Sequence, residues 1–182
     1  MKKVLLLGDS IRLSYQSRVK EHLAGSAEVF GPADNCRFAK YTLWHADTWA
    51  RENGKPDLIH WNNGIWDIFR INEDVGIFTE IDEYIKDLKR VLFELRKTDA
   101  RIIWASTTPV NNKSKDCRNE DIDRYNAAAK SLMVSEEIEV NDLNSLIKGN
   151  IDLYIAQDNL HLTQEGQAAA AKAVSDFCRR YL

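Results

Sequence analysis

Short apolar runs alternate with longer segments of helical character along this chain. The apolar runs lie at residues 4–7, 27–30, 57–61 and 101–106, with a weaker one at 138–140. The segments with helical character lie at residues 14–24, 40–54, 79–97, 120–133 and 163–181. Continuous apolar runs suit strands that are buried on both faces, and regular alternation with helices predicts a parallel sheet covered on both sides. The expected fold class is therefore α/β.

Length and charge limit the number of domains and the kinds of partner that can be expected. A chain of 182 residues without repeats or a linker predicts a single domain over residues 1–182. The net charge of -3 gives no basic excess for nucleic acid, and no apolar stretch approaches the ~20 residues of a membrane span. The start MKKVLLLGD holds an apolar run too short for a signal peptide, so a cytoplasmic protein is expected.

The cysteines argue against a structural metal or disulfide. Cys36, Cys117 and Cys178 are odd in number, widely spaced and without a CxxC pair. Such spacing does not fit a disulfide framework or a zinc site. Neither a metal nor another cofactor is expected, and the oligomeric state is left open.

The first apolar run ends on Gly8, Asp9 and Ser10. These residue types suit a turn followed by a helix start, and they equally suit a serine nucleophile held at the edge of the sheet. Ligands of such sheets bind beyond the carboxyl ends of the strands, so the residues that follow each strand are the ones to inspect. Beyond Ser10 these are residues 35–37, 62–64 and 107–109.

A serine nucleophile needs a base and an orienting acid, and His161 with Asp158 offers both. His161 lies in a predicted loop before the last helix, three residues after Asp158. The carboxylate can accept a hydrogen bond from Nδ1, which leaves Nε2 for the serine proton. The alternative is a turn-forming aspartate beside a surface histidine. The other histidines lie in predicted helices or a strand, where packing is the simpler role: His22, His45 and His60.

Acyl transfer also needs donors directed at the developing oxyanion. The Ser10 backbone N–H is one candidate, and the side-chain amide of Asn63, at the end of the third run, is another. Asn63 is alternatively a turn residue before Gly64.

Together these residues resemble the SGNH hydrolases, also called GDSL-like esterases and lipases, over the whole chain. Residues 8–10 resemble the first family block, which implies that Ser10 is the nucleophile. Residues 158–161 match the DxxH block, which implies that Asp158 and His161 complete a catalytic triad.

Two further blocks depart from the family pattern. The stretch WNNG resembles the block GxND and implies an oxyanion role for Asn63, although Trp61 replaces the glycine and Gly64 the aspartate. The glycine of the second block falls on Cys36, whose backbone N–H is the implied third donor. The resemblance is nearest to the short single-domain members and implies a three-layer α/β/α sandwich with a flavodoxin-like sheet of five parallel strands.

The loop around the proposed oxyanion asparagine suggests the substrate. Trp61, Trp66 and Asp67 combine aromatic faces with a polar group, which suits a sugar ring or a small acyl group. The alternative, equally consistent with the sequence, is that Trp61 and Trp66 are core residues. The expected activity is a carboxylic ester hydrolase that removes a small acyl group, such as acetyl, from a carbohydrate or another small ester. The final acceptor, water or another hydroxyl, is left open. The alternative is a non-catalytic flavodoxin-like domain that binds a sugar or nucleotide, although residues 8–15 supply only one glycine for a phosphate loop.

Overall fold

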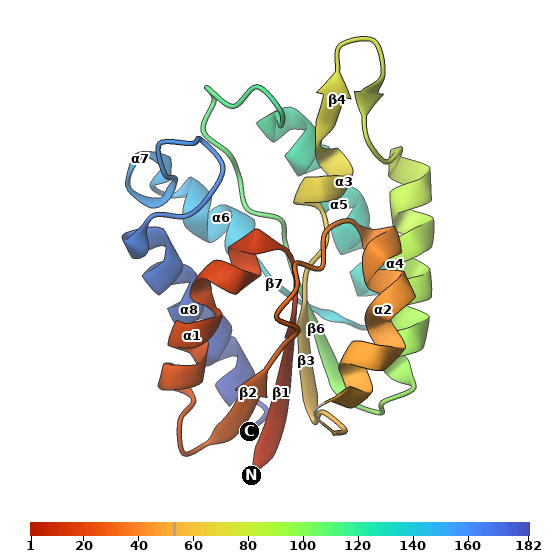
Figure 1. Ribbon diagram of the computed structural model, residues 1–182, viewed down its shortest axis with the longest axis vertical. Coiled ribbons are helices and arrows are strands. Elements are labelled where there is room, and N and C mark those ends of the chain that lie inside the picture. The colour runs from red at the N-terminus through yellow and green to blue at the C-terminus, as the bar shows by residue number, and fades with distance from the viewer. Residues whose placement is uncertain (53) are drawn as a thin grey trace.

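The central element is a parallel five-stranded sheet in the order β2-β1-β3-β6-β7 (Figure 1). The structure is a computed structural model that describes residues 1–52 and 54–182. The strands are β1 (Lys2–Leu7), β2 (Ala27–Phe30), β3 (Leu58–Trp61), β6 (Arg101–Ala105) and β7 (Glu139–Asn141). The expectation of an α/β fold with five parallel strands is confirmed.

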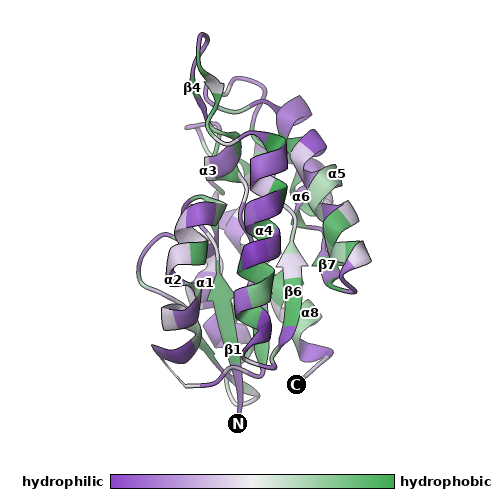
Figure 2. Cartoon of the chain, turned by 90° about the vertical axis from the view of Figure 1, so that its right-hand side faces the viewer, coloured by the Kyte–Doolittle hydropathy of each residue, from purple (hydrophilic) through white to green (hydrophobic). Residues whose placement is uncertain are grey.

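Helices cover both faces of the sheet. One face is covered by α1 (Ser10–His22), α6 (Leu143–Lys148), α7 (Ile151–Tyr154) and α8 (Gln164–Arg179). The other is covered by α2 (Ala39–Glu52), α4 (Ile81–Arg96) and α5 (Asn119–Ser135). Figure 2 shows the hydrophobic strands β1 and β6 behind the hydrophilic outer side of α4. The fold is a three-layer α/β/α sandwich.

Strand β1 supplies both cores because its side chains alternate between the two faces of the sheet. Leu5 and Leu7 pack with the α2, α4 and α5 layer, whereas Val4 and Leu6 pack with the α1 and α8 layer. All four side chains are fully buried. This explains why the run carries no polar alternation.

Several elements differ from the sequence-based expectation. Helix α1 begins at Ser10, four residues earlier than predicted, because Asp9 caps it. The helix expected over residues 40–54 is α2, and residue 53 lies outside the described residues. Four short elements were not predicted, since they span too few residues to show a period: α3 (Ile65–Ile68), β4 (Arg70–Asn72), β5 (Gly76–Ile77) and α7. Helix α6 was not predicted either.

The order of the strands locates the region where a ligand would bind. Strand β1 lies between β2 and β3, so the chain leaves the sheet toward opposite faces on either side of this point. Such a switch in strand order opens a crevice at the carboxyl ends of the strands. Ser10 follows β1 at this position.

None of the helices among residues 1–52 and 54–182 has the length and apolar character needed to cross a membrane.

Candidate active site

The turn after β1 presents Ser10 as the first residue of α1. The Asp9 carboxylate accepts a hydrogen bond from the Ile11 N–H at 2.9 Å, which caps the helix. Gly8 is required here, because a Cβ at this position would lie 2.8 Å from Cβ of Arg12. Burial raises the pKa of Asp9, an effect that the Ile11 N–H and the Arg12 guanidinium oppose. The turn thus fixes the Ser10 backbone at a helix N-terminus.

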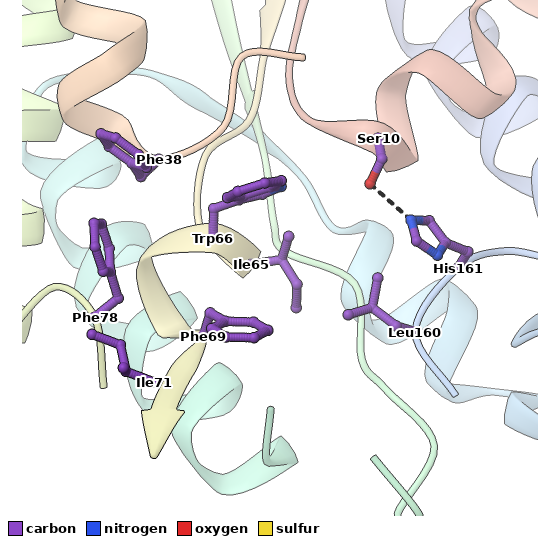
Figure 3. A pocket seen from close by; sticks show the side chains of 9 residues that line it. All are labelled: Ser10, Phe38, Ile65, Trp66, Phe69, Ile71, Phe78, Leu160 and His161. Carbon is purple, nitrogen blue, oxygen red and sulfur yellow. Dashed lines mark hydrogen bonds between the residues drawn. The ribbon is translucent and has the colours of Figure 1, made fainter. Parts of the chain in front are cut away.

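The loop before α8 presents His161 to Ser10. His161 Nε2 lies 3.0 Å from Ser10 Oγ (Figure 3), and Nδ1 lies 2.7 Å from Asp158 Oδ2. The other carboxylate oxygen of Asp158 accepts hydrogen bonds from the backbone N–H groups of Leu160 and His161, at 3.0 and 2.9 Å. The structure therefore brings the three residues of the expected triad into one chain of hydrogen bonds.

The environment of Asp158 favours its charged form. Partial burial acts to raise the pKa of this carboxyl, but the N–H groups of Leu160 and His161 and the imidazole together hold the pKa below its usual value. An ionised Asp158 can accept a hydrogen bond from Nδ1–H of His161, which leaves Nε2 as the acceptor for the Ser10 hydroxyl. The hydroxyl, the imidazole and the carboxylate are therefore arranged as a nucleophile, a base and an orienting acid would need to be.

Two packed helices set the distance between Ser10 and His161. Ser10 begins α1, and His161 lies three residues before α8, whose N-cap Thr163 accepts from the Gly166 N–H. The helices share one buried cluster, to which Tyr15 and Val19 contribute from α1 and Ala170, Ala171 and Val174 from α8. Small alanine side chains permit a close approach. The geometry of the site therefore rests on rigid elements rather than on loops alone.

Neither of the two further donors implied by the family resemblance is open to the cleft. The Cys36 N–H donates to the Gly8 carbonyl at 3.1 Å, and the Cys36 side chain is fully buried. This corrects the expectation that the Cys36 N–H is available to an oxyanion. Asn63 is also fully buried, and its Nδ2 donates to Arg37 O at 3.0 Å and to Thr42 Oγ1 at 2.8 Å. Both amide hydrogens of Asn63 are therefore already used.

Two of the three expected pocket residues lie in the core instead. Trp61 is fully buried, and its Nε1 donates to Asn63 Oδ1 at 2.7 Å. Asp67 is 1% exposed and accepts from the Ala39 N–H with both oxygens, at 3.0 and 3.2 Å. Asp67 thus satisfies the first N–H of α2. Burial raises its pKa to about 7, against the opposing effect of the Ala39 and Thr79 hydrogen bonds.

Arg12 is a site residue that sequence reasoning missed. Its guanidinium is 1% exposed and donates to the carbonyls of Gly8, Pro32 and Asp34. Two of these bonds reach across to the loop after β2, so the side chain ties this loop to the nucleophile turn. The only signal in the sequence was a cationic residue two positions after the serine, which is not specific.

A cleft of about 490 Å³ opens beside Ser10 and His161. Trp66 lines it as expected, 40% exposed. The remaining lining residues were not predicted and are all apolar: Phe38, Ile65, Phe69, Ile71, Phe78 and Leu160. Figure 3 shows Ile65 and Leu160 on the side of the Ser10–His161 pair, and Phe38, Phe78 and Ile71 at the opposite side.

The other three histidines and the three cysteines do not line the cleft. His60 is fully buried in β3, His45 stacks on Trp49, and His22 lies 3.3 Å from Ser175 Oγ. Over the described ranges, residues 1–52 and 54–182, no three His, Cys, Asp or Glu side chains gather as metal ligands would. The three cysteines are free and buried.

The fold is one that esterases and acylhydrolases adopt. A lipase/acylhydrolase from Enterococcus faecalis superposes with a TM-score of 0.84 at 17% identity, over 99% of this chain and 96% of that one. An acetylxylan esterase from Geobacillus stearothermophilus gives 0.81 at 18% identity, over 99% and 94%. A carbohydrate esterase of family 3 from Talaromyces cellulolyticus gives 0.77 at 18% identity, over 99% and 97%. No family model and no curated protein matches the sequence.

Proposed function

We propose that this protein is a carboxylic ester hydrolase with Ser10 as its nucleophile. The observation that carries the proposal is the chain of hydrogen bonds from Ser10 Oγ through His161 to Asp158, at 3.0 and 2.7 Å. This chain lies at the mouth of the cleft, where a substrate can reach the hydroxyl. The fold shared with esterases and acylhydrolases supports the same reading.

In the proposed first step, His161 Nε2 takes the proton of Ser10 as Oγ attacks the ester carbonyl. Asp158 stabilises the imidazolium that forms. When the tetrahedral intermediate collapses, the carbonyl–alkoxy bond breaks and His161 returns the proton to the leaving alcohol. A water molecule then repeats the sequence on the acyl-serine ester, which releases the carboxylic acid and free Ser10.

The Ser10 N–H is the proposed oxyanion donor. It is the first N–H of α1, and the N–H groups of the first helical turn have no acceptor within the helix. The N-terminal end of a helix also carries a partial positive charge that stabilises a nearby oxyanion. The role predicted for Asn63 requires its amide to leave Arg37 O or Thr42 Oγ1 as the reaction proceeds.

The substrate class is proposed as a small-molecule ester. Two of the similar structures are named as an acetylxylan esterase and a carbohydrate esterase, and the small acyl group on a carbohydrate that the sequence suggested is one member of this class. The nucleotide-binding alternative has less support, because no lysine or arginine is among the described residues that line the cleft.

Replacement of Ser10 tests the proposal directly. We expect Ser10→Ala to lower kcat for p-nitrophenyl butanoate by roughly 10³-fold or more, because the nucleophile is lost. The fold should be retained, since among residues 1–52 and 54–182 Ser10 Oγ hydrogen-bonds to the exposed His161 alone. Ser14→Ala, one turn further along α1 with its hydroxyl bonded to Ile11 O, is the matched control. A Ser10→Ala protein that keeps more than about a tenth of wild-type kcat would refute the assignment.

A further inference from the structure

Exposed apolar side chains concentrate in one short segment of the chain. Among the described residues, ten large apolar side chains are exposed, and five of these fall within residues 66–78. They belong to α3 and to the hairpin formed by β4 and β5: Trp66, Phe69, Ile71, Val75 and Phe78. Scattered exposed apolar residues need no explanation, but a contiguous group marks a binding surface.

Four of the five side chains line the cleft that begins at Ser10, and only Val75 does not. In Figure 3 the lining side chains extend from Ser10 and His161, past Ile65 and Leu160, to the hairpin at the far end. There Phe78 packs against Phe38, with ring centroids 5.1 Å apart. The nucleophile therefore lies at one end of an apolar channel, and the hairpin forms the other end.

The hairpin is fixed in place by bonds at its base. The Arg70 N–H donates to Asp116 O at 2.7 Å, and the Arg70 guanidinium pairs with Asp121 of α5 at 2.7 Å. The Phe78 N–H donates to Phe69 O at 2.8 Å, which closes the hairpin. A wall that is held before the ligand arrives loses little conformational freedom on binding. The channel is thus preformed.

The start of the channel assigns it to one half of an ester. Ser10 and His161 both line the channel, which extends from this pair toward Trp66 and Phe38 (Figure 3). The leaving alcohol takes its proton from His161 Nε2 and departs, whereas the acyl group stays bonded to Ser10 Oγ. The half of the substrate assigned to a channel that begins at Ser10 is therefore the acyl group.

We propose that the hairpin of residues 69–78 makes this protein selective for esters of medium-length apolar acyl groups, with Ile71 and Phe78 contacting the distal end of the chain. This inference rests on the proposed esterase function. An acetyl group, with one methyl, leaves most of a 490 Å³ channel empty. A sugar ring would bring hydroxyl groups to a wall that offers them almost no hydrogen-bond partner, which is costly. An unbranched acyl chain matches the lining.

A series of p-nitrophenyl esters from acetate to dodecanoate tests the preference, because the alcohol is constant. Each buried methylene is worth about fourfold in binding, so kcat/KM for hexanoate should exceed that for acetate by at least about tenfold. Acetate esters of alcohols of increasing length provide the second arm, and they should show a much weaker dependence. A steeper dependence on the alcohol than on the acyl group would overturn the inference.

Variants of the distal wall test the role of the hairpin. Ile71→Ser and Phe78→Ser should each lower the hexanoate-to-acetate ratio of kcat/KM by about threefold to tenfold, since apolar contacts to the chain end are lost. Phe78→Trp, which retains the apolar packing against Phe38, should lower the ratio for decanoate to butanoate by shortening the channel. Val75→Ser, on the same hairpin but outside the lining, is the matched control and should leave the ratios unchanged.

The outcomes separate the two proposals. If the wild-type protein hydrolyses acetate as well as or better than every longer ester, the acyl preference is overturned while the esterase proposal stands. If the ratios are the same in wild type, Ile71→Ser and Phe78→Ser, the hairpin does not select the acyl group. If no ester in either arm is hydrolysed, both proposals fail.

Discussion

Asp67 lies in α3 and Asp158 in the loop before α8, and their surroundings differ in every respect that matters for a carboxylate. Asp158 is exposed and accepts hydrogen bonds from two backbone N–H groups and an imidazole, and its pKa lies below the usual value. Asp67 is buried and accepts a hydrogen bond from the Ala39 N–H, and burial raises its pKa to about 7. One carboxylate is hydrogen-bonded to an imidazole, and the other accepts the first N–H of a helix. Residue type does not assign the role, whereas solvent and hydrogen-bond partners do.

The largest contrast should appear in activity. We expect Asp158→Asn to lower kcat by roughly 10³ to 10⁴-fold, because an amide can donate to Nδ1 and stabilise the wrong tautomer of His161. Asp67→Asn keeps an acceptor for Ala39 and should retain most of the wild-type kcat. Ester hydrolysis by the two purified variants is the measurement, with the exposed Asp152→Asn of α7 as a control. Equal losses in the two variants would remove the distinction between these aspartates.

A second contrast should appear in the pH dependence of stability. The pKa of Asp67 is about 7 in the folded state and near 4 when unfolded, so the unfolded state loses its proton first as pH rises. Asp67 therefore makes the free energy of unfolding fall with pH between about 4 and 7, by up to about 1.4 kcal/mol per pH unit. Asp67→Asn should remove this contribution, as urea unfolding across the same pH range would show.

His60 should act in the opposite direction over the same range. Burial lowers its pKa to about 4 from a usual value near 6.5, so the unfolded state binds the proton first as pH falls. Stability from the neutral buried imidazole is present above pH 6.5 and is lost as pH falls toward 4. His60→Gln is therefore the counterpart of Asp67→Asn, and the two variants should change the slope with opposite signs. A change of the same sign in both would contradict the assignment of either pKa.

The smallest contrast should appear in stability at a fixed pH. Asp67→Ala leaves the N–H of Ala39 buried without its acceptor, which should lower the free energy of unfolding by about 1 to 3 kcal/mol. Asp158→Ala removes a carboxylate that is exposed to solvent, so its midpoint of urea unfolding should stay close to that of the wild type. A large loss of stability in Asp158→Ala would mean that the loop before α8 depends on the Asp158 turn to fold.

The sequence predicted the features of the fold and site that depend on local patterns. Gly8, Asp9 and Ser10 form a strand end and a helix cap, and both can be read from neighbouring residues. Asp158 and His161 are three residues apart, so one turn brings them together. Ser10 follows β1, so its place at the carboxyl edge of the sheet could be expected from the topology. His161 reaches it from the loop before α8.

The residues that were placed incorrectly depend on contacts between distant segments. Whether the amide of Asn63 is free is decided by Arg37 O and Thr42 Oγ1, which no pattern around Asn63 reveals. Trp61 ends a strand and faces the core, while Trp66 lies on α3 and faces the cleft. The hairpin was missed because strands of two and three residues carry no period, although Gly76, with φ of 78°, marks its turn.

The packing of α8 against α1 has a consequence for the order in which the protein matures. Ser10 leaves the ribosome early, while His161 follows about 150 residues later and lies three residues before α8, which begins at Gln164. Until that helix docks, the growing chain carries an ordinary hydroxyl with no imidazole beside it. In the proposed mechanism, the nascent chain can therefore hydrolyse an ester only after synthesis has passed α8 and the two helices have come together.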